Sequence, residues 1–274
     1  MNQNLNTPGI AKSAVARLHA DGGATSLNDN VVVEEPLEIR IGNRPFVVTM
    51  RTPGNDKELA AGFMTTEGFT YSKSDFKDID RCRMASNPEN TIRIRMSTGV
   101  NPEKIESHRY GAISASCGVC GKTSIESIRN SYPDIQSDCK IERATLLSLP
   151  DRLRKSQVVF EKTGGLHSSG LFDKAGNLLC LKEDVGRHNA LDKVIGFALL
   201  NDIWPLENHI LMVSGRVSFE IIQKALAARI PIVAAVSAPS SLAISVAREC
   251  GITLVGFLRN PTMNVYSHPH RISK

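Results

Sequence analysis

Two cysteines separated by two residues carry the most distinctive chemistry in this sequence. Cys117 and Cys120 lie in the segment Cys-Gly-Val-Cys-Gly-Lys, in which a glycine follows each cysteine. Two thiols at this spacing can hold a metal, exchange a disulfide or carry sulfur as a persulfide. Because the surrounding residues are small and polar, we expect a thiolate on an exposed, movable loop over residues 108–123.

Two other uses of a Cys-x-x-Cys pair fit the sequence less well. Zinc needs four ligands, and the chain has no second Cys-x-x-Cys and no histidine pair at a suitable spacing; only His108 and Cys139 could complete a site through folding. A thioredoxin-type pair usually follows a strand and begins a helix, which this polar segment does not predict. A thiolate on a loop hinged by glycines can instead travel between two partners, and Lys122 could lower its pKa.

The last third of the chain predicts a layered α/β unit. Apolar strands are expected at 209–214, 231–236 and 252–258, and helices are expected to begin at Ser218 and Ser240. Strands that alternate with helices in this way predict a βαβαβ unit with a parallel sheet and right-handed crossovers.

Serines and arginines follow the ends of these predicted strands, in the segments Ser214-Gly-Arg216, Ser237-Ala-Pro-Ser240 and Phe257 to Thr262. In open α/β sheets, ligands bind beyond the carboxyl ends of the strands and against helix N-termini. The arginines and hydroxyl groups therefore favour a phosphate or pyrophosphate ligand. The same residue types also serve as ordinary helix caps and surface arginines, so both interpretations stay open.

Two further segments combine glycine with ionisable residues. The polar block Glu183–Lys193 contains His188, which could be a proton donor, a substrate contact or a hydrogen-bonded residue at a helix start. A helix is expected from Ser148 to the pair Gly164-Gly165. The segment Thr163–Gly170 is either a glycine turn before a strand or a place where the backbone approaches a ligand.

Composition and pattern divide the chain into three expected parts. Of its 274 residues, 41% are apolar and 22% charged, with a formal net charge of +5, which is typical of a globular protein and favours anionic ligands. Residues 1–28 predict a flexible tail, residues 29–145 a smaller β-rich subdomain with the cysteine loop, and residues 146–274 an α/β core. With no export signal and few cysteines, we expect reduced thiols in the cytoplasm and no membrane segment.

Several segments are distinctive when they are taken together in chain order. They are Glu58-Leu-Ala-Ala-Gly-Phe, Cys117-Gly-Val-Cys-Gly, Thr163-Gly-Gly-Leu-His, the polar block, Ser214-Gly-Arg-Val-Ser-Phe-Glu, and Ala238-Pro-Ser-Ser-Leu-Ala with Arg259 and Val265-Tyr. From about residue 30 to the C-terminus this set closely resembles the FdhD/NarQ family. The polar block is far more specific than the Cys-x-x-Cys pair.

The resemblance implies a cytoplasmic sulfurtransferase that is needed for formate dehydrogenase activity, with a cytidine-deaminase-like α/β core and a homodimeric state. In the family, a cysteine desulfurase hands sulfur to the Cys-x-x-Cys loop, and the protein passes it to the bis-molybdopterin guanine dinucleotide form of the molybdenum cofactor. Cys117 matches the persulfide-carrying residue and Cys120 the second cysteine. No structural metal and no nucleic-acid partner are expected. The family's cofactor-binding segment matches Phe257, Leu258, Arg259, Asn260, Pro261 and Thr262.

Two other functions remain open at this point. A nucleotide-binding accessory protein that stabilises a molybdenum enzyme without sulfur chemistry would use the same arginines. A small zinc-stabilised RNA-binding protein would use the Cys-x-x-Cys pair and the basic charge, but aromatic residues are few and no basic stripe is present.

Overall fold

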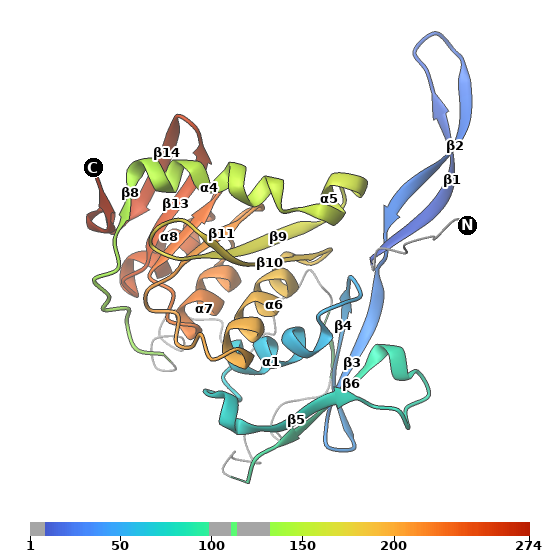
Figure 1. The fold of residues 1–274 in the computed structure, drawn as a ribbon, viewed down its shortest axis with the longest axis horizontal. Helices are drawn as coiled ribbons and strands as arrows, with labels where there is room; N and C mark the ends of the chain where they lie inside the picture. The colour runs from blue at the N-terminus through green and yellow to red at the C-terminus, as the bar shows by residue number, and fades with distance from the viewer. Residues whose placement is uncertain (1–8, 99–110, 114–131) are drawn as a thin grey trace.

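The structure contains two main β-sheets joined through helices (Figure 1). It is a computed structural model that describes residues 9–98, 111–113 and 132–274. The larger sheet belongs to the C-terminal part of the chain and the smaller one to the N-terminal part. Helices α1 (Asp56–Thr66) and α6 (Arg187–Leu200) pack against each other between them.

The larger sheet has six strands in the order β10-β9-β11-β12-β13-β14. The predicted βαβαβ unit is confirmed, because β11 pairs in parallel with β12 and β12 with β13. The sheet as a whole is mixed and not mostly parallel, since β9–β10 and β13–β14 are hairpins, and short connections join only antiparallel strands. The strands are β9 (His167–Phe172), β10 (Leu178–Asp184), β11 (Ile210–Val213), β12 (Ile232–Ala235), β13 (Thr253–Arg259) and β14 (Thr262–Ser267).

Helices cover both faces of this sheet. Figure 1 shows α4 (Arg143–Lys155) on one face and α6 with α7 (Phe219–Ala227) on the other. Two separate clusters of buried apolar side chains fill the two interfaces. Residues 230–247 carry no charged side chain and form β12, a turn and the start of α8 (Ser241–Glu249), in agreement with the strand and helix predicted there. Among the described helices, none is long and apolar enough to cross a membrane.

The helix expected from Ser148 to Gly164 is longer and consists of two pieces. Helix α4 begins at Arg143, because Leu146, Leu149 and Leu153 form an apolar stripe that is buried against the sheet. The chain breaks after α4 and continues as the short helix α5 (Val158–Thr163), which ends at a left-handed glycine, Gly164 with φ 67°.

The smaller sheet has the order β5-β6-β3-β4-β7. Strands β3 and β4 form an antiparallel hairpin, with Gly42 at φ 60° in its turn. Helix α1 covers one face of this sheet in a cluster that includes Leu37, Ile39 and Leu59. The strands are β3 (Glu35–Ile41), β4 (Arg44–Arg51), β5 (Phe76–Arg81), β6 (Thr91–Met96) and β7 (Gly111–Ile113); short elements elsewhere are β8 (Ile141–Glu142), β15 (Ile272–Ser273), η1 (Lys73–Asp75), η2 (Pro88–Asn90) and η3 (Pro269–Arg271).

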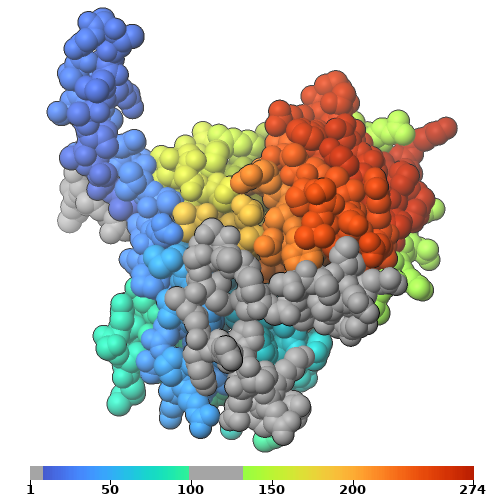
Figure 2. Space-filling model, turned by 180° about the vertical axis from the view of Figure 1, so that it is seen from behind, coloured from blue at the N-terminus to red at the C-terminus, as the bar shows by residue number. Residues whose placement is uncertain are grey.

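The N-terminal segment differs from the tail expected over residues 1–28. Strands β1 (Ile10–Leu18) and β2 (Ala24–Val32) form an antiparallel hairpin that extends away from the body of the molecule (Figures 1 and 2). The sequence does not reveal this hairpin because most of its side chains are exposed, so no face had to be apolar.

Helices α1 and α6 are in direct backbone contact. A Cβ atom added to Gly62 of α1 would lie 1.8 Å from the carbonyl oxygen of Asp192, and one added to Gly196 would lie 1.8 Å from that of Glu58. Glycine at both positions is what permits so close an approach. The contact couples the two sheets, because α1 covers the smaller sheet and α6 covers the larger one.

Candidate functional site

The carboxyl ends of the three parallel strands lie at one edge of the larger sheet, as the sequence predicted. Antiparallel β9 begins at this edge, because its Ser169 pairs with Val213, the last residue of β11. Strand β10 ends there, because Asp184 pairs with His167. Helix α6 begins just after β10 ends, so its start also lies at this edge. Each strand of the sheet either begins or ends here.

The predicted cofactor segment, residues 257–262, comprises the end of β13, the turn that follows and the first residue of β14 at this edge. Phe257 has φ 49° and is 41% exposed, so a strained backbone presents an aromatic ring to solvent. Arg259 is exposed, and its Nε donates to the carbonyl oxygen of Val236 at 3.3 Å. Leu258 is fully buried, so it can meet a ligand only through its backbone. The last three residues of the segment complete the turn and begin β14.

The serines at the other strand ends both make structural contacts. Ser240 is an ordinary helix cap, because its Oγ accepts a hydrogen bond from the backbone N–H of Ala243 at 3.2 Å. The Oγ of Ser214 accepts a hydrogen bond from the backbone N–H of Ser168 at 2.9 Å and thereby ties β11 to β9. Arg216, two residues further on, is exposed at the edge.

The polar block mainly connects the two sheets through an ion pair and hydrogen bonds. The Asp184 carboxylate lies 2.7 Å from Lys193 Nζ, and both side chains are buried. The same carboxylate accepts hydrogen bonds from the backbone N–H groups of Thr52 and Gly186. Glu183 accepts two more from the start of α5. Most of the ionisable groups in the block are therefore explained by structural contacts.

His188 is the hydrogen-bonded residue at a helix start that the sequence left as one of three possibilities. Its Nε2 lies 3.2 Å from Ser218 Oγ and 3.9 Å from a Glu220 carboxylate oxygen. Burial, together with the nearby cations Lys224 and Arg187, lowers the pKa of His188 to about 4. The imidazole is therefore neutral near pH 7.

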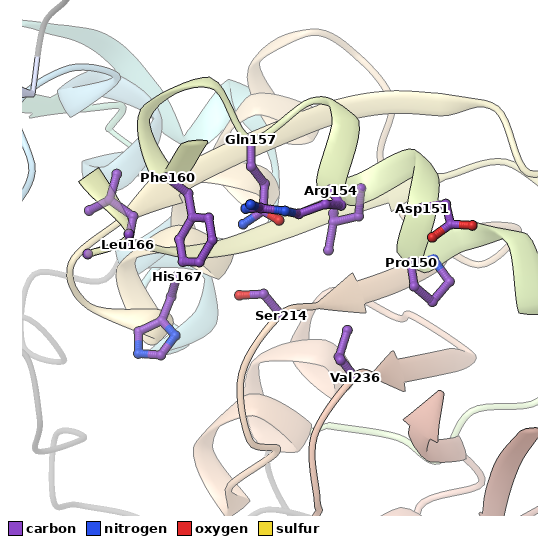
Figure 3. A pocket seen from close by; sticks show the side chains of 12 residues that line it. Pro150, Asp151, Arg154, Gln157, Phe160, Leu166, His167, Ser214 and Val236 are labelled. Atoms are coloured by element: carbon purple, nitrogen blue, oxygen red, sulfur yellow. The ribbon is translucent and has the colours of Figure 1, made fainter. Parts of the chain in front are cut away.

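A hollow of about 650 Å³ opens beside the sheet edge, under helices α4 and α5. Figure 3 shows the side chains of Arg154, Gln157 and Phe160 on the helix side of it, with Ser214 below. The guanidinium carbon of Arg154 lies 4.6 Å from the centre of the Phe160 ring. The pair Gly164-Gly165 lines one end, and both interpretations of this segment, a glycine turn before β9 and a backbone approach to a ligand, stay open.

Two arginines act electrostatically on His167, which lies at one end of this hollow. His167 lines the hollow; burial lowers its pKa, and Arg187 and Arg216 lower it further. The Nε of Arg187 is buried without a hydrogen-bond partner in the part of the chain that the structure describes. This end of the hollow therefore has a positive potential that favours an anion.

The predicted catalytic cysteines, Cys117 and Cys120, lie outside the described residues. The four described cysteines are buried, and burial raises the pKa of Cys180 to about 11 and that of Cys139 as well. Thiols of this kind react poorly. Over residues 9–98, 111–113 and 132–274 there is no group of three or more His, Cys, Asp or Glu residues that could hold a metal; the expectation of no structural metal stays a prediction.

Sequence reasoning located the edge and missed most of the hollow. Arg154, Gln157 and Phe160 come from α4, α5 and their junction, which have no motif typical of a ligand site. The signals came from Ser214 at a predicted strand end and from the segment Thr163–Gly170, where adjacent glycines allow a close approach of the backbone.

Comparisons with known proteins agree with this architecture. A crystal structure described as that of a formate dehydrogenase accessory protein from Desulfotalea psychrophila has the same fold, with a TM-score of 0.77 over 97% of this chain and all of that one, at 24% identity. A sulfur carrier protein FdhD from Streptomyces avermitilis is 47% identical over 260 residues, which is 92% of each chain. The protein of that name from Mycobacterium tuberculosis is 44% identical over 272 residues, 96% of this chain and 98% of its own.

The family model agrees with the same assignment. The model of the FdhD/NarQ family matches residues 32–273, which is nearly the whole chain and leaves out most of the β1–β2 hairpin. The resemblance seen in the sequence is thereby confirmed: the chain belongs to the FdhD/NarQ family.

Proposed function

We propose that this protein is a sulfur carrier that accepts sulfur from a cysteine desulfurase and delivers it to the bis-molybdopterin guanine dinucleotide cofactor of formate dehydrogenase. Membership of a family whose relatives are named sulfur carrier proteins, together with the Cys117–Cys120 pair, is the observation that carries the proposal. Its setting is the cytoplasm, where thiols stay reduced, and its working form is a homodimer.

Sulfur uptake is a thiol exchange without net oxidation. The Cys117 thiolate attacks the terminal sulfur of the persulfide on the desulfurase. A new sulfur–sulfur bond forms on Cys117 while the bond in the donor breaks, and the donor cysteine leaves as a thiolate. The product is a Cys117 persulfide that carries one transferable sulfur atom.

Sulfur release uses the second cysteine. The Cys120 thiolate attacks the inner sulfur of the Cys117 persulfide, which forms a Cys117–Cys120 disulfide and frees hydrosulfide for the metal of the cofactor. The two electrons that reduce the sulfur come from the two thiols. A dithiol reductant then reopens the disulfide before the next cycle.

The cofactor is the substrate of this reaction, and its anionic pyrophosphates suit the sheet edge. Arg259 and Arg216 stand at the ends of β13 and β11, where guanidinium groups can pair with phosphate oxygens. Ile113, four residues before Cys117, is paired with Thr49 of β4, and Thr49 Oγ1 donates to Asn189 Oδ1 near the start of α6 at 3.5 Å. The chain that leads to Cys117 therefore begins at a strand that is connected to the start of α6 at this edge. Four residues span at most roughly 14 Å, so this connection is short.

Transfer of labelled sulfur from the loaded protein to the cofactor tests the proposal. We expect Cys117→Ala to abolish both the mass increase of one sulfur after incubation with desulfurase and cysteine and the subsequent transfer. Cys120→Ser should load sulfur and fail to release it over repeated turnovers. Cys82→Ala, which removes a buried cysteine far from the loop in sequence, is the matched control and should behave as wild type. Equal transfer by wild type and Cys117→Ala would favour the accessory protein without sulfur chemistry.

A further inference from the structure

Strand β14 is the last strand of the larger sheet, and its outer side is unpaired in the described part of the chain. Its inner side pairs with β13. Among the described residues, the outer backbone groups of Met263–Val265 make no hydrogen bond; at the end of the strand, Arg248 Nε donates to the carbonyl oxygen of Tyr266 at 3.1 Å. Figure 1 shows the β13–β14 hairpin at the outside of the molecule. Free backbone groups along an edge are a template for another strand.

The edge strand β14 lacks the charges that keep other edge strands from pairing. Proteins place charged side chains on exposed edges because these oppose association with another chain. Strand β14 has the sequence Thr-Met-Asn-Val-Tyr-Ser, without an acidic or basic residue. Two other edge strands are charged: β10, at the opposite edge of the same sheet, has Lys182 and Glu183, and β5, at an edge of the smaller sheet, has Lys77, Asp78, Asp80 and Arg81. The outer side of β14 is therefore suited to pairing.

A groove of about 400 Å³ runs beside β14 on the face of the sheet that α4 covers. Met263 and Val265 line it from the strand, and Leu147 lines it from α4. Because side chains alternate along a strand, Met263 and Val265 share one face. The groove is completed mainly by apolar groups, from Arg143, Pro261, Thr262, Pro269 and Ile272. It can therefore receive apolar side chains from a strand that is added to this edge.

Exposed apolar side chains lie on β14 and on its neighbours. Val265 is 39% exposed, Phe257 of β13 is 41% exposed, and Leu242 at the start of α8 is 43% exposed. Figure 2 shows the C-terminal strands, in red, at the surface of the molecule. Apolar groups that gather beside an unpaired edge are typical of an interaction surface.

The properties of β14 favour a second copy of the same strand over a charged peptide. In an antiparallel pair around a two-fold axis, the same residues of both strands project to the same face. Met263 and Val265 of the second copy then project to the α4 side, where the groove lies. Two uncharged strands meet without like-charge repulsion. Of the described residues that line the groove, only Arg143 is charged, so a strongly charged peptide has little to pair with.

We propose that β14 pairs in antiparallel orientation with β14 of a second copy, so that the two six-stranded sheets form one continuous sheet. The existence of a homodimer rests on the proposed function, and the pairing locates its interface. The two-fold axis reverses the direction of every strand in the second copy. The carboxyl edges of the two sheets therefore face opposite ways, and each copy keeps its own sheet edge.

Sedimentation velocity of the full chain over a range of concentrations tests this interface. We expect wild type to be a dimer and Val265→Lys to dissociate at least about tenfold more readily, because an axis at mid-strand brings the two copies of residue 265 within roughly 8 Å. An equimolar mixture of Val265→Lys and Val265→Glu should restore the dimer, since opposite charges then face each other. Leu179→Lys is the matched control: Leu179 is also 39% exposed but lies on β10, and this variant should associate as wild type does.

Hydrogen exchange of the wild-type protein gives a second measurement that needs no variant. The amides of β14 should be protected at high protein concentration and lose that protection on dilution. The amides of β12, in the middle of the sheet, are the internal control and should be protected equally at every concentration.

Several results would overturn the proposal. They are a wild type that stays monomeric, a dimer that Leu179→Lys weakens and Val265→Lys does not, and exchange of the β14 amides that is independent of concentration. Sulfur chemistry is tested separately, because Val265→Lys should still gain the mass of one sulfur from desulfurase and cysteine, and Cys117→Ala should stay dimeric. A wild type that forms this dimer and loads no sulfur would contradict the proposed function alone.

Discussion

His188 shows how burial turns a titratable residue of the polar block into a pH-dependent element of stability. Its folded pKa of about 4 is below the value of 6.5 for the free side chain. Between these two pH values the unfolded chain binds a proton that the folded chain does not, so the free energy of unfolding falls as the pH decreases from about 6.5 to about 4. The pKa difference corresponds to a loss of about 3 kcal/mol.

Urea unfolding at pH 7 and at pH 4.5 measures this contribution. In His188→Gln, where an amide replaces the imidazole beside Ser218, we expect the loss of stability between the two pH values to be smaller than in wild type by about 2 kcal/mol. His19→Gln, on the exposed β1–β2 hairpin, is the control and should keep the full wild-type pH dependence. An unchanged pH dependence in His188→Gln would show that the imidazole titrates in the folded protein as it does in water.

At the residue scale, the sequence predicted which residues lie at the sheet edge better than it predicted which residues contact one another. Arg259 and Ser214 were placed at the sheet edge because strand ends can be located from apolar runs and the turns that follow them. Gln157 was not placed beside the hollow, because it lies at the junction of α4 and α5, which has no motif typical of a ligand site. Leu258 was assigned to the ligand segment through family resemblance, yet its side chain belongs to the core.

The β1–β2 hairpin is the element least supported by the rest of the molecule. A two-stranded hairpin in water is marginally stable, and most of its side chains are exposed, including Leu18 at 78%. Strands β11, β12 and β13, in contrast, are buried on both faces. Local opening should therefore be far easier in the hairpin than in the central sheet.

Hydrogen exchange followed by mass spectrometry tests this difference. We expect the amides of β1 and β2 to be protected at least about a hundredfold less than those of β11 and β12. The β3–β4 hairpin is the internal control, since it has the same topology but packs against α1, and it should be well protected. Protection of β1–β2 equal to that of β3–β4 would show that another surface, such as a second copy of the chain, covers the hairpin.

Elements with a buried face were predictable and exposed ones were not. The strands at 209–214, 231–236 and 252–258 were found because burial between two helix layers demands continuous apolar runs. The β9–β10 and β13–β14 hairpins, which make the sheet mixed, add antiparallel strands at both sides of the predicted unit. The cytidine-deaminase-like arrangement stays a prediction that follows from the family resemblance.

At the scale of the whole molecule, the two sheets share their cores. Trp204, the only tryptophan of the sequence, packs against the apolar clusters of both sheets. Its indole N–H donates to the carbonyl oxygen of Tyr71 at 3.0 Å. Lys224 of α7 lies 2.9 Å from Asp192 of α6 and 3.2 Å from Glu67 next to α1, so a buried charge cluster spans three helices. These contacts predict one cooperative folding unit, even though the sequence suggested a β-rich subdomain and an α/β core.

Unfolding in urea with two probes tests this unity. Trp204 fluorescence reports the junction, and far-UV circular dichroism reports all elements; we expect coincident midpoints. In Lys224→Met, which leaves two buried carboxylates unpaired, both midpoints should fall together by an amount equivalent to about 3–5 kcal/mol. Lys73→Met removes an exposed ion pair with Asp202 and is the matched control, with an expected loss below about 1 kcal/mol. If the fluorescence midpoint alone moved in Lys224→Met, the two sheets would be separate folding units. The contacts at the start of α6 would then not hold Ile113, where the chain that leads to Cys117 begins, in a fixed position relative to the edge of the larger sheet.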